Sequence, residues 1–204
     1  RFHRRMYEYD VQQRQAQWQV LPQITASDVT IGIMGLGVLG ESAAAVLTKM
    51  NYPVTGWSRA RNIIHDLRSY VGESELLEFL SDAHILVVLL PLDETTQHIL
   101  NKGTLARLPR GACVINAGRG GLIHETDLLN ALDKGYISGA ALDVFETEPL
   151  HETHLFWRHP NVTVTPHAAS LTNPLTAGQL VVENMRRHQN GKRLQHIVVP
   201  TDRR

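Results

Sequence analysis

The chain has 204 residues, of which 43% are hydrophobic, so it can bury one large core. Its 20 Lys and Arg residues balance 20 Asp and Glu residues, which gives no reason to expect a nucleic acid or an anionic membrane surface as partner. The single cysteine, Cys113, can form no internal disulfide, and no apolar run approaches the length of a membrane span. We therefore expect a globular, cytoplasmic protein.

The first 27 residues are polar and rich in Gln and Arg. They predict a helix over residues 1–17, followed by an extended connector that contains Trp18. A solvated tail is the alternative. Trp18 argues against it, because a large aromatic side chain usually covers another surface.

Residues 30–40, TIGIMGLGVLG, pass from a β-favouring apolar run into three glycines with GxGxxG spacing. Gly35 allows a tight turn out of the strand, Gly37 lets the backbone approach a pyrophosphate, and Gly40 lets the next helix pack closely. The N–H groups at the start of that helix would face the anion. The stretch therefore predicts a phosphate-binding turn.

The segments after this turn support that interpretation. Residues 38–50 have a helix-forming composition, and residues 53–57 supply a second short strand. This strand begins about 20 residues after the first glycine, as a dinucleotide-binding βαβ unit requires. A flexible glycine loop without a ligand is the alternative, and the context on both sides disfavours it.

Apolar and helical segments alternate along the rest of the chain. We expect helices over residues 59–70, 74–80, 104–108, 125–134 and 174–190, and strands over residues 84–90, 112–116, 139–144 and 162–165. Unbroken apolar runs such as HILVVLL are typical of strands that are buried on both faces of a parallel sheet. The alternation predicts an α/β fold, a doubly wound, mainly parallel Rossmann sheet with helices on both faces.

Reactive residues follow three of the predicted strands, on the side where doubly wound sheets bind their ligands. Arg119 follows the first of these strands in INAGRGG. Asp143 ends the second strand, and Glu148 comes five residues later in DVFETEPL. His167 follows the third strand in VTVTPHAAS. Each residue alone has an ordinary structural explanation, but their occurrence together at strand ends indicates a catalytic site.

These residues, the glycine stretch and LPLDETTQHILN (residues 90–101) resemble the D-isomer-specific 2-hydroxyacid dehydrogenase family. The resemblance covers nearly the whole chain. It is also carried by the segments WSRAR, LPRGACVINAGRG, LDVFETEPL and FWRHPNVTVTPHAA. It implies an oxidoreductase, an NAD(P)-dependent 2-hydroxyacid dehydrogenase or 2-oxoacid reductase. The implied substrates are small 2-oxo acids such as glyoxylate or hydroxypyruvate.

The resemblance implies Arg119, Glu148 and His167 as the catalytic residues. His167 would protonate the keto oxygen as the hydride arrives, and the Glu148 carboxylate would favour the cationic imidazole. Arg119 would bind the substrate carboxylate and polarise the keto group through its planar guanidinium. Asp143 would accept a hydrogen bond from the nicotinamide amide and so orient the ring.

The resemblance also implies the contacts to the cofactor, with apolar side chains after residue 89 against the adenine. The residues expected to bind the cofactor are Gly35, Leu36, Gly37, Val38, Leu39, Gly40, Ser58, Arg59, Arg61, Leu90, Pro91, Leu92, Thr96, Ala117, Gly118 and Asp143.

The end of the second strand predicts which dinucleotide is preferred. An acidic residue there would accept hydrogen bonds from the ribose hydroxyls and repel a 2′-phosphate, whereas this chain has Ser58, Arg59 and Arg61. We therefore expect NADP(H) to be preferred over NAD(H). Two surface arginines near a helix start are the alternative explanation.

The resemblance implies a domain organisation as well. The family has an N-terminal substrate domain ahead of the helix with which this chain begins, so we expect the chain to be a fragment. Residues 1–27 would be a truncated interdomain helix and dimerisation arm, residues 28–170 the dinucleotide-binding domain, and residues 171–204 a C-terminal helix and tail that would return to the substrate domain. In the family the arm crosses to a partner subunit, so we expect a homodimer.

Two other functions were considered. His151 and His154 have i, i+3 spacing, unlike the i, i+4 spacing of HExxH zinc sites, and the chain lacks a second cysteine, so we expect no metal. The other possibility is a non-catalytic, dimerising, dinucleotide-binding module of the corepressor type. The presence of all three catalytic residue types favours descent from an enzyme.

Overall fold

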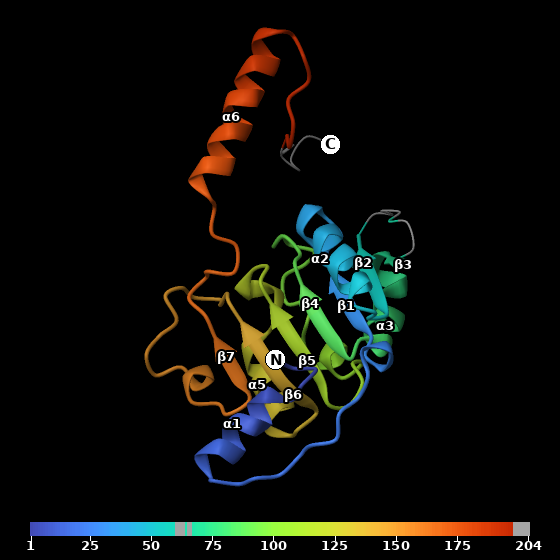
Figure 1. Cartoon of the computed structure of the whole chain (residues 1–204), viewed down its shortest axis with the longest axis vertical. Coiled ribbons are helices and arrows are strands. Elements are labelled where there is room, and N and C mark those ends of the chain that lie inside the picture. Colours follow the sequence, from blue (N-terminus) through green and yellow to red (C-terminus); the bar gives the residue numbers. More distant parts are fainter. Residues whose placement is uncertain (60–63, 65–66, 198–204) are drawn as a thin grey trace. The chain divides into compact units, whose positions relative to one another are not determined.

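The computed structural model describes residues 1–59, 64 and 67–197 of the chain, and Figure 1 shows its elements. The chain divides into two compact units, Arg1–Ala169 and a second unit that begins at Ser170. Among the described residues, no helix combines the length and the apolar composition that crossing a membrane requires.

A seven-stranded sheet is the centre of the first unit. Its strands are β1 (Ile31–Met34), β2 (Val54–Ser58), β3 (Arg68–Val71), β4 (Ile85–Val88), β5 (Ala112–Asn116), β6 (Ile137–Leu142) and β7 (Val162–Val164). They lie in the order β3-β2-β1-β4-β5-β6-β7, and every pair is parallel. The predicted doubly wound Rossmann sheet is therefore confirmed. The chain reverses direction across the sheet between β1 and β4, which is where such folds bind their ligands.

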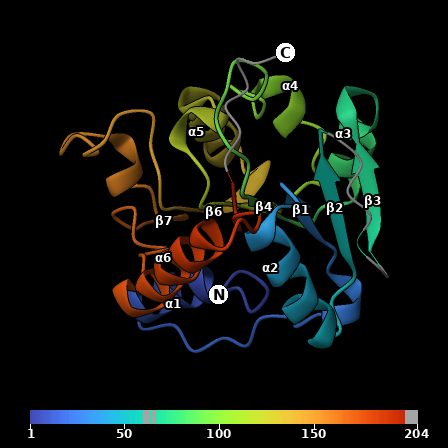
Figure 2. The same ribbon diagram turned by 90° about the horizontal axis from the view of Figure 1, so that it is seen from above.

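Helices cover both faces of this sheet. Within the first unit they are α1 (Met6–Arg14), α2 (Val38–Lys49), α3 (Gly72–Asp82), α4 (Lys102–Leu105) and α5 (Glu125–Asp133), with short 3-10 turns η1 (Ala26–Asp28), η2 (Gly120–Leu122) and η3 (Leu155–Trp157). Figure 2 shows α1 and α2 on one side of the sheet and α4 and α5 on the other. The sheet is thus the middle of three layers.

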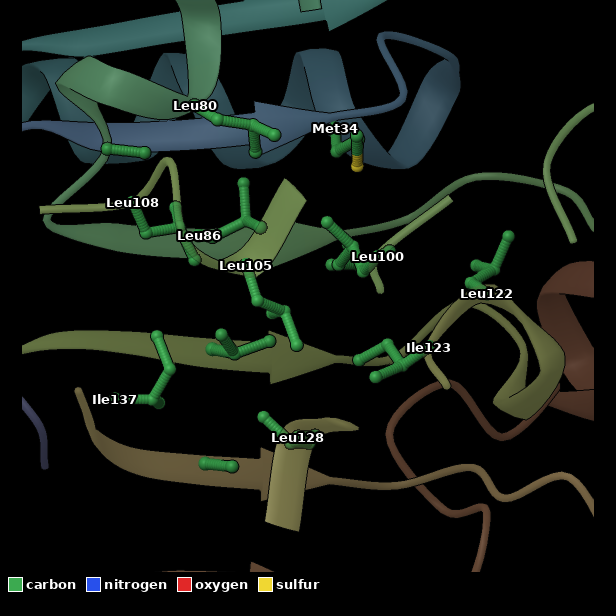
Figure 3. Close-up of a cluster of buried hydrophobic side chains, with 14 of the residues drawn as sticks. Met34, Leu80, Leu86, Leu100, Leu105, Leu108, Leu122, Ile123, Leu128 and Ile137 are labelled. Atoms are coloured by element: carbon green, nitrogen blue, oxygen red, sulfur yellow. The ribbon is translucent and has the colours of Figure 1, made fainter. Parts of the chain in front are cut away.

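Alternate residues of the strands pack into two hydrophobic cores, one on each face of the sheet. In β4, Leu86 joins the core under α3, α4 and α5, whereas its neighbour Ile85 joins the core under α1 and α2. Figure 3 shows the first core, in which Leu86 lies among side chains from helices such as Leu80 and Leu128. Burial on both faces explains why the sequence of β4 is a continuous apolar run.

The first helix is shorter than the sequence predicts. It occupies Met6–Arg14 instead of residues 1–17, and the left-handed backbone of Arg5 (φ 51°) and of Ala16 (φ 53°) lies just outside its two ends. Instead of extending the helix, Phe2 packs into the hydrophobic core that includes Ile31 and Ile33 of β1. Burial of this aromatic side chain outweighs the weak helical preference of a polar segment.

The expectation of a helix over residues 59–70 is wrong at its C-terminal end. Residues Arg68–Val71 form β3, which pairs in parallel with β2 at the edge of the sheet. Tyr70 is buried there, and its aromatic ring suits a strand. The rest of the expected helix falls largely on residues outside the described ones.

The second unit contains α6 (Pro174–Gln189). Asn173 caps this helix by accepting a hydrogen bond from the Leu175 N–H at 2.9 Å, and Pro174 is its first residue, as the sequence predicts. The segment after the helix folds back onto it, because Asn184 exchanges two hydrogen bonds with the backbone of Gln195.

Candidate active site

The glycine turn joins β1 to α2 at the carboxyl edge of the sheet. Gly35 has a φ of +110°, and a Cβ there would lie 2.9 Å from the Leu89 backbone. A Cβ on Gly40 would lie 2.0 Å from the Gly35 carbonyl oxygen, so α2 packs directly on the turn. Gly37 is exposed, and apart from Gly37 and its two chain neighbours, no atom of the described residues lies within 4 Å of where a Cβ would be. The backbone is therefore open to a ligand where the motif requires it.

The start of α2 fits a phosphate. Gly37 is its N-cap, and because glycine has no side chain it cannot itself cap the first N–H groups of the helix. Those N–H groups carry the positive end of the helix dipole. Val38 and Leu39 are exposed beside them, whereas Leu36 is buried against Gly56. The turn and the helix start thus form a cradle that suits a pyrophosphate.

Ser58 ends β2, and Arg59 follows it directly in the chain. The Arg59 guanidinium forms an ion pair with the carboxylate of Asp93 and donates to the Thr95 hydroxyl at 3.1 Å. Hydrogen bonds from Thr95 and the charge of Arg59 lower the pKa of Asp93 to about 2. Arg59 is thus present at the expected strand end but already has an anionic partner. Arg61 lies outside the described residues.

The loop after β4 contains four of the expected cofactor residues. Leu90 is buried in the core, whereas Pro91 and Leu92 are exposed. Thr96 is fully buried, and its hydroxyl donates to the Pro91 carbonyl at 2.8 Å and accepts from the Asp93 N–H at 2.8 Å. Its side chain therefore shapes the loop, while Pro91 and Leu92 are the members that face outward.

Arg119 lies in the turn after β5, together with Ala117 and Gly118. The buried amide of Asn116 fixes this turn: it accepts from the Gly118 N–H at 3.1 Å and donates to the Arg119 carbonyl at 3.0 Å. A Cβ on Gly118 would lie 2.9 Å from the Leu90 carbonyl oxygen, so the turn packs against the loop after β4. The Arg119 side chain is exposed, with Nη1 donating to the Gly118 carbonyl at 2.7 Å.

Asp143 follows β6 and is 6% exposed. Its carboxylate accepts from the Thr165 hydroxyl at 2.5 Å and from the N–H groups of Ala168 and Ala169, each at 2.9 Å. Burial raises the pKa of Asp143, but these hydrogen bonds and the charge of His167 outweigh it, so the pKa lies below its ordinary value. In this structure Asp143 therefore holds the loop that carries His167.

His167 and Glu148 form a pair. His167 Nδ1 lies 2.7 Å from Glu148 Oε2, and Glu148 Oε1 accepts from the Phe145 N–H at 3.0 Å. The hydrogen bond with His167 is the main cause that lowers the pKa of Glu148. His167 has a φ of 53°, a left-handed conformation that costs energy in a non-glycine residue, and its N–H donates to the Asp143 carbonyl at 2.8 Å.

One cleft of about 560 Å³ brings the three expected catalytic residues together. Arg119, Glu148 and His167 all line it, with Leu92 and His98 on the same wall. The arrangement offers a guanidinium for a carboxylate and an imidazole whose Nε2 is not engaged by Glu148. A carboxylate next to a polarisable carbonyl matches these two groups.

Sequence reasoning missed several residues that build this cleft. Asn116 directly precedes the glycine turn, and an asparagine there commonly bonds the N–H two residues on, so it could have been found. His98 Nε2 lies 2.7 Å from Glu146 Oε1, a contact between loops that no sequence pattern indicates. Glu125, at the start of α5, accepts from the Glu146 N–H at 3.0 Å, and it too was missed.

The histidines considered as metal ligands have other partners. His151 Nδ1 lies 2.9 Å from the Thr153 hydroxyl, and His154 Nε2 lies 3.3 Å from a Glu125 oxygen. Within residues 1–59, 64 and 67–197, no group of three or more His, Cys, Asp or Glu side chains is arranged to hold a metal ion.

The fold agrees with a comparison to known proteins. Residues 1–169 match the family model described as D-isomer specific 2-hydroxyacid dehydrogenase, NAD binding domain. The chain belongs to this family of oxidoreductases. A curated relative, the glyoxylate/hydroxypyruvate reductase A of Photorhabdus laumondii subsp. laumondii, is 44% identical over 189 residues, which are 93% of this chain and 60% of the relative. The chain thus spans well under two thirds of that relative's length.

Solved structures show the same family. A D-isomer specific 2-hydroxyacid dehydrogenase from Xanthobacter autotrophicus Py2, in complex with NADPH and MES, is 39% identical with a TM-score of 0.93, covering 97% of this chain and 82% of its own. An NADPH-dependent glyoxylate/hydroxypyruvate reductase from Sinorhizobium meliloti, in complex with NADP and sulfate, is 41% identical with a TM-score of 0.91. The match covers 96% of this chain and 63% of that one.

Proposed function

We propose that this chain is the cofactor-binding part of an NADPH-dependent reductase that converts small 2-oxo acids, such as glyoxylate or hydroxypyruvate, to 2-hydroxy acids. The observation that carries the proposal is the convergence of Arg119, Glu148 and His167 on one cleft. The names of the Photorhabdus and Sinorhizobium relatives supply the substrate class.

The side chains divide the work of the reaction. A bound NADPH supplies the hydride that adds to the carbonyl carbon. Arg119 binds the substrate carboxylate through its fixed guanidinium plane and places the carbonyl at the imidazole. His167 Nε2 gives its proton to the carbonyl oxygen, forming the hydroxyl group, and takes a new proton from solvent afterwards. Glu148 holds Nδ1, so that Nε2 faces the substrate and the cationic ring is stabilised before transfer.

Asp143 supports this geometry through the backbone. It binds the N–H groups of both residues after His167, and its own carbonyl accepts the His167 N–H. These bonds stabilise the left-handed conformation of His167. Its expected contact with the nicotinamide amide would add to this role, because a carboxylate oxygen has lone pairs for more than one donor.

We propose NADP(H) as the preferred cofactor. Arg59 stands where an acidic residue would select NAD(H), and the Xanthobacter and Sinorhizobium structures carry NADPH and NADP. To bind a 2′-phosphate, the Arg59 guanidinium would share or exchange its contact with Asp93. The 2′-phosphate would gain a charge-assisted hydrogen bond that NADH cannot form.

We also propose a homodimer assembled through the N-terminal segment. Trp18 is 100% exposed in the isolated chain, and Val20 and Ile24 beside it are exposed as well. An exposed tryptophan is a typical anchor of a protein interface. A second copy of the chain is the proposed partner.

The experiment that tests the function separates binding from turnover. The chain is fused to the substrate domain of the Photorhabdus relative, and NADPH oxidation by glyoxylate and hydroxypyruvate is followed with and without His167→Ala. Oxidation that His167→Ala abolishes, while NADPH still binds, is the expected result. A folded fusion that binds NADPH but reduces neither acid would contradict the proposal and favour the non-catalytic module.

A further inference from the structure

The loop that carries Glu148 is held at two points by one side chain. Glu125 is the first residue of α5, and its carboxylate is 18% exposed. One of its oxygens, Oε1, accepts from the Glu146 N–H at 3.0 Å, and the other, Oε2, lies 3.3 Å from His154 Nε2. Glu146 precedes Glu148 in the loop and His154 follows it. Both oxygens of Glu125 are thus used on the same loop, one on each side of the catalytic carboxylate.

The far end of the loop is held at His154. His154 Nδ1 accepts from the Phe156 N–H at 3.3 Å, and His154 Nε2 lies 3.3 Å from Glu125 Oε2. The His154 ring also packs against the Phe156 ring at 4.7 Å between centroids, and Phe156 is 1% exposed. This end of the loop is therefore anchored in the core.

The other end of the loop cannot approach the cleft any further. A Cβ on Gly120 would lie 1.8 Å from the Phe145 carbonyl carbon, so the loop backbone already rests on the turn after β5. His98 Nε2 holds the Glu146 side chain at 2.7 Å. The loop is thus confined between Gly120 on one side and Glu125 on the other, and the Phe145 N–H in this confined segment binds Glu148 directly.

We propose that Glu125 is a positioning residue of the reductase, which sets the place of the Glu148 carboxylate, and through it the orientation of His167, without touching substrate or cofactor. The inference rests on the proposed function for its catalytic meaning. The location of Glu125 suits the role, because the positive end of the α5 dipole favours an ionised carboxylate in the first turn.

The test measures the titration of Glu148 by carboxyl carbon NMR in the 204-residue chain, without cofactor. The groups that act on Glu148 are the His167 ring, the Phe145 N–H and the charge of Arg119. In Glu125→Ala the loop is released, and the pKa of Glu148 should rise toward the ordinary glutamate value as the bond to His167 loosens. In Glu125→Gln the amide oxygen still accepts the Glu146 N–H, but the carboxylate oxygen beside His154 Nε2 is lost, so the pKa should rise less than in Glu125→Ala.

Glu152→Gln is the matched control, because it removes an exposed carboxylate from the same loop. It should leave the Glu148 titration unchanged. An unchanged titration in a folded Glu125→Ala chain would overturn the proposal, and so would an equal rise in Glu152→Gln. If Glu125→Ala does not fold, His154→Ala releases one of the two contacts, and the absence of any rise there would overturn it equally. NADPH binding by the wild-type chain is measured separately, so a failure of the proposed function is distinguishable from a failure of this inference.

Discussion

Glu148 Oε2 lies 2.7 Å from His167 Nδ1, although the two residues are 19 positions apart and follow different strands. The distance is short enough for a charge-assisted hydrogen bond, which stabilises the carboxylate and the cationic imidazole together. This hydrogen bond is the chief cause that lowers the pKa of Glu148 below its ordinary value.

The pair should make stability depend on pH. Because the pKa of Glu148 is lower in the folded chain than in the unfolded chain, its contribution is fully present above the ordinary glutamate pKa. This contribution to stability is lost as the pH falls through the lowered pKa that Glu148 has in the folded chain. We expect the difference in unfolding free energy between wild type and Glu148→Gln to be largest near neutral pH and to shrink in acid. Urea unfolding at several pH values measures it, and a difference that grows in acid would contradict the assignment.

Asp143 should be needed for a stable loop after β7. In Asp143→Asn one side-chain oxygen becomes an NH₂ group, which cannot accept the backbone N–H that the lost oxygen bound. We expect a loss of about 1–3 kcal/mol in stability, as for other buried groups left without a partner. Thermal or urea unfolding measures the loss. Glu152→Gln, an equivalent change at an exposed site, is the control and should change little.

Arg59 should strengthen NADPH binding, and Asp93 should weaken it by competing for the Arg59 guanidinium. Arg59→Ala removes the proposed partner of the 2′-phosphate, so NADPH binding should weaken about tenfold while NADH binding changes little. Asp93→Asn keeps the oxygen that accepts the Thr95 N–H but removes the competing charge, so NADPH should bind more tightly. Fluorescence titrations with both cofactors measure these effects. Equal affinities of the wild type for NADPH and NADH would contradict the assignment.

Trp18 should be an anchor of the dimer. Truncation of a fully desolvated interface tryptophan typically costs 2 kcal/mol or more, so Trp18→Ala should raise the dimer dissociation constant by about 30-fold or more. Sedimentation of wild type and variant over a range of concentrations measures it. Leu155→Ala, another exposed apolar side chain, serves as the control. A monomeric wild type at micromolar concentration would count against the interface.

The sequence predicts every strand of the sheet except β3, which lies at one edge. The strand Ala112–Asn116 has the expected bounds because its first four residues are apolar and it is bounded by a turn on each side. Strand β3 was not expected, because an edge strand pairs on one side only and its few residues show no distinct pattern. Whether such a segment becomes a strand depends on the free edge of β2, which is a tertiary property.

In the site, the sequence predicts the residues that follow strands but not those that reach the site from other elements. Arg119 and His167 each follow a strand closely, so their place at the carboxyl edge follows from the order of elements alone. Glu125 binds the Glu146 N–H from 21 residues away, and it comes from a helix start where acidic residues are common in any case. Its role becomes visible only when the loop after β6 is seen to return past α5.

Turnover should require more of the protein than cofactor binding does. The chain spans 60% of the length of its Photorhabdus relative, and the resemblance implies that the remainder includes a substrate domain that shares the carboxylate contacts. In a polypeptide tested without such a domain, we expect Arg119 to act in a medium of higher dielectric and the substrate to be less well oriented. We expect the isolated 204-residue polypeptide to bind NADPH yet reduce glyoxylate barely above background.

The matched comparison is the same chain fused to the substrate domain of that relative, assayed at equal NADPH saturation. The fusion should gain at least about 100-fold in rate, because misplacing a substrate by even a small distance costs rate on this scale. The gain should be lost in Arg119→Ala, which removes the carboxylate partner, but kept in Glu152→Gln. Rapid reduction of glyoxylate by the isolated polypeptide would show instead that the groups after β5, β6 and β7 suffice for the reaction, and that closure over the cleft contributes little to it.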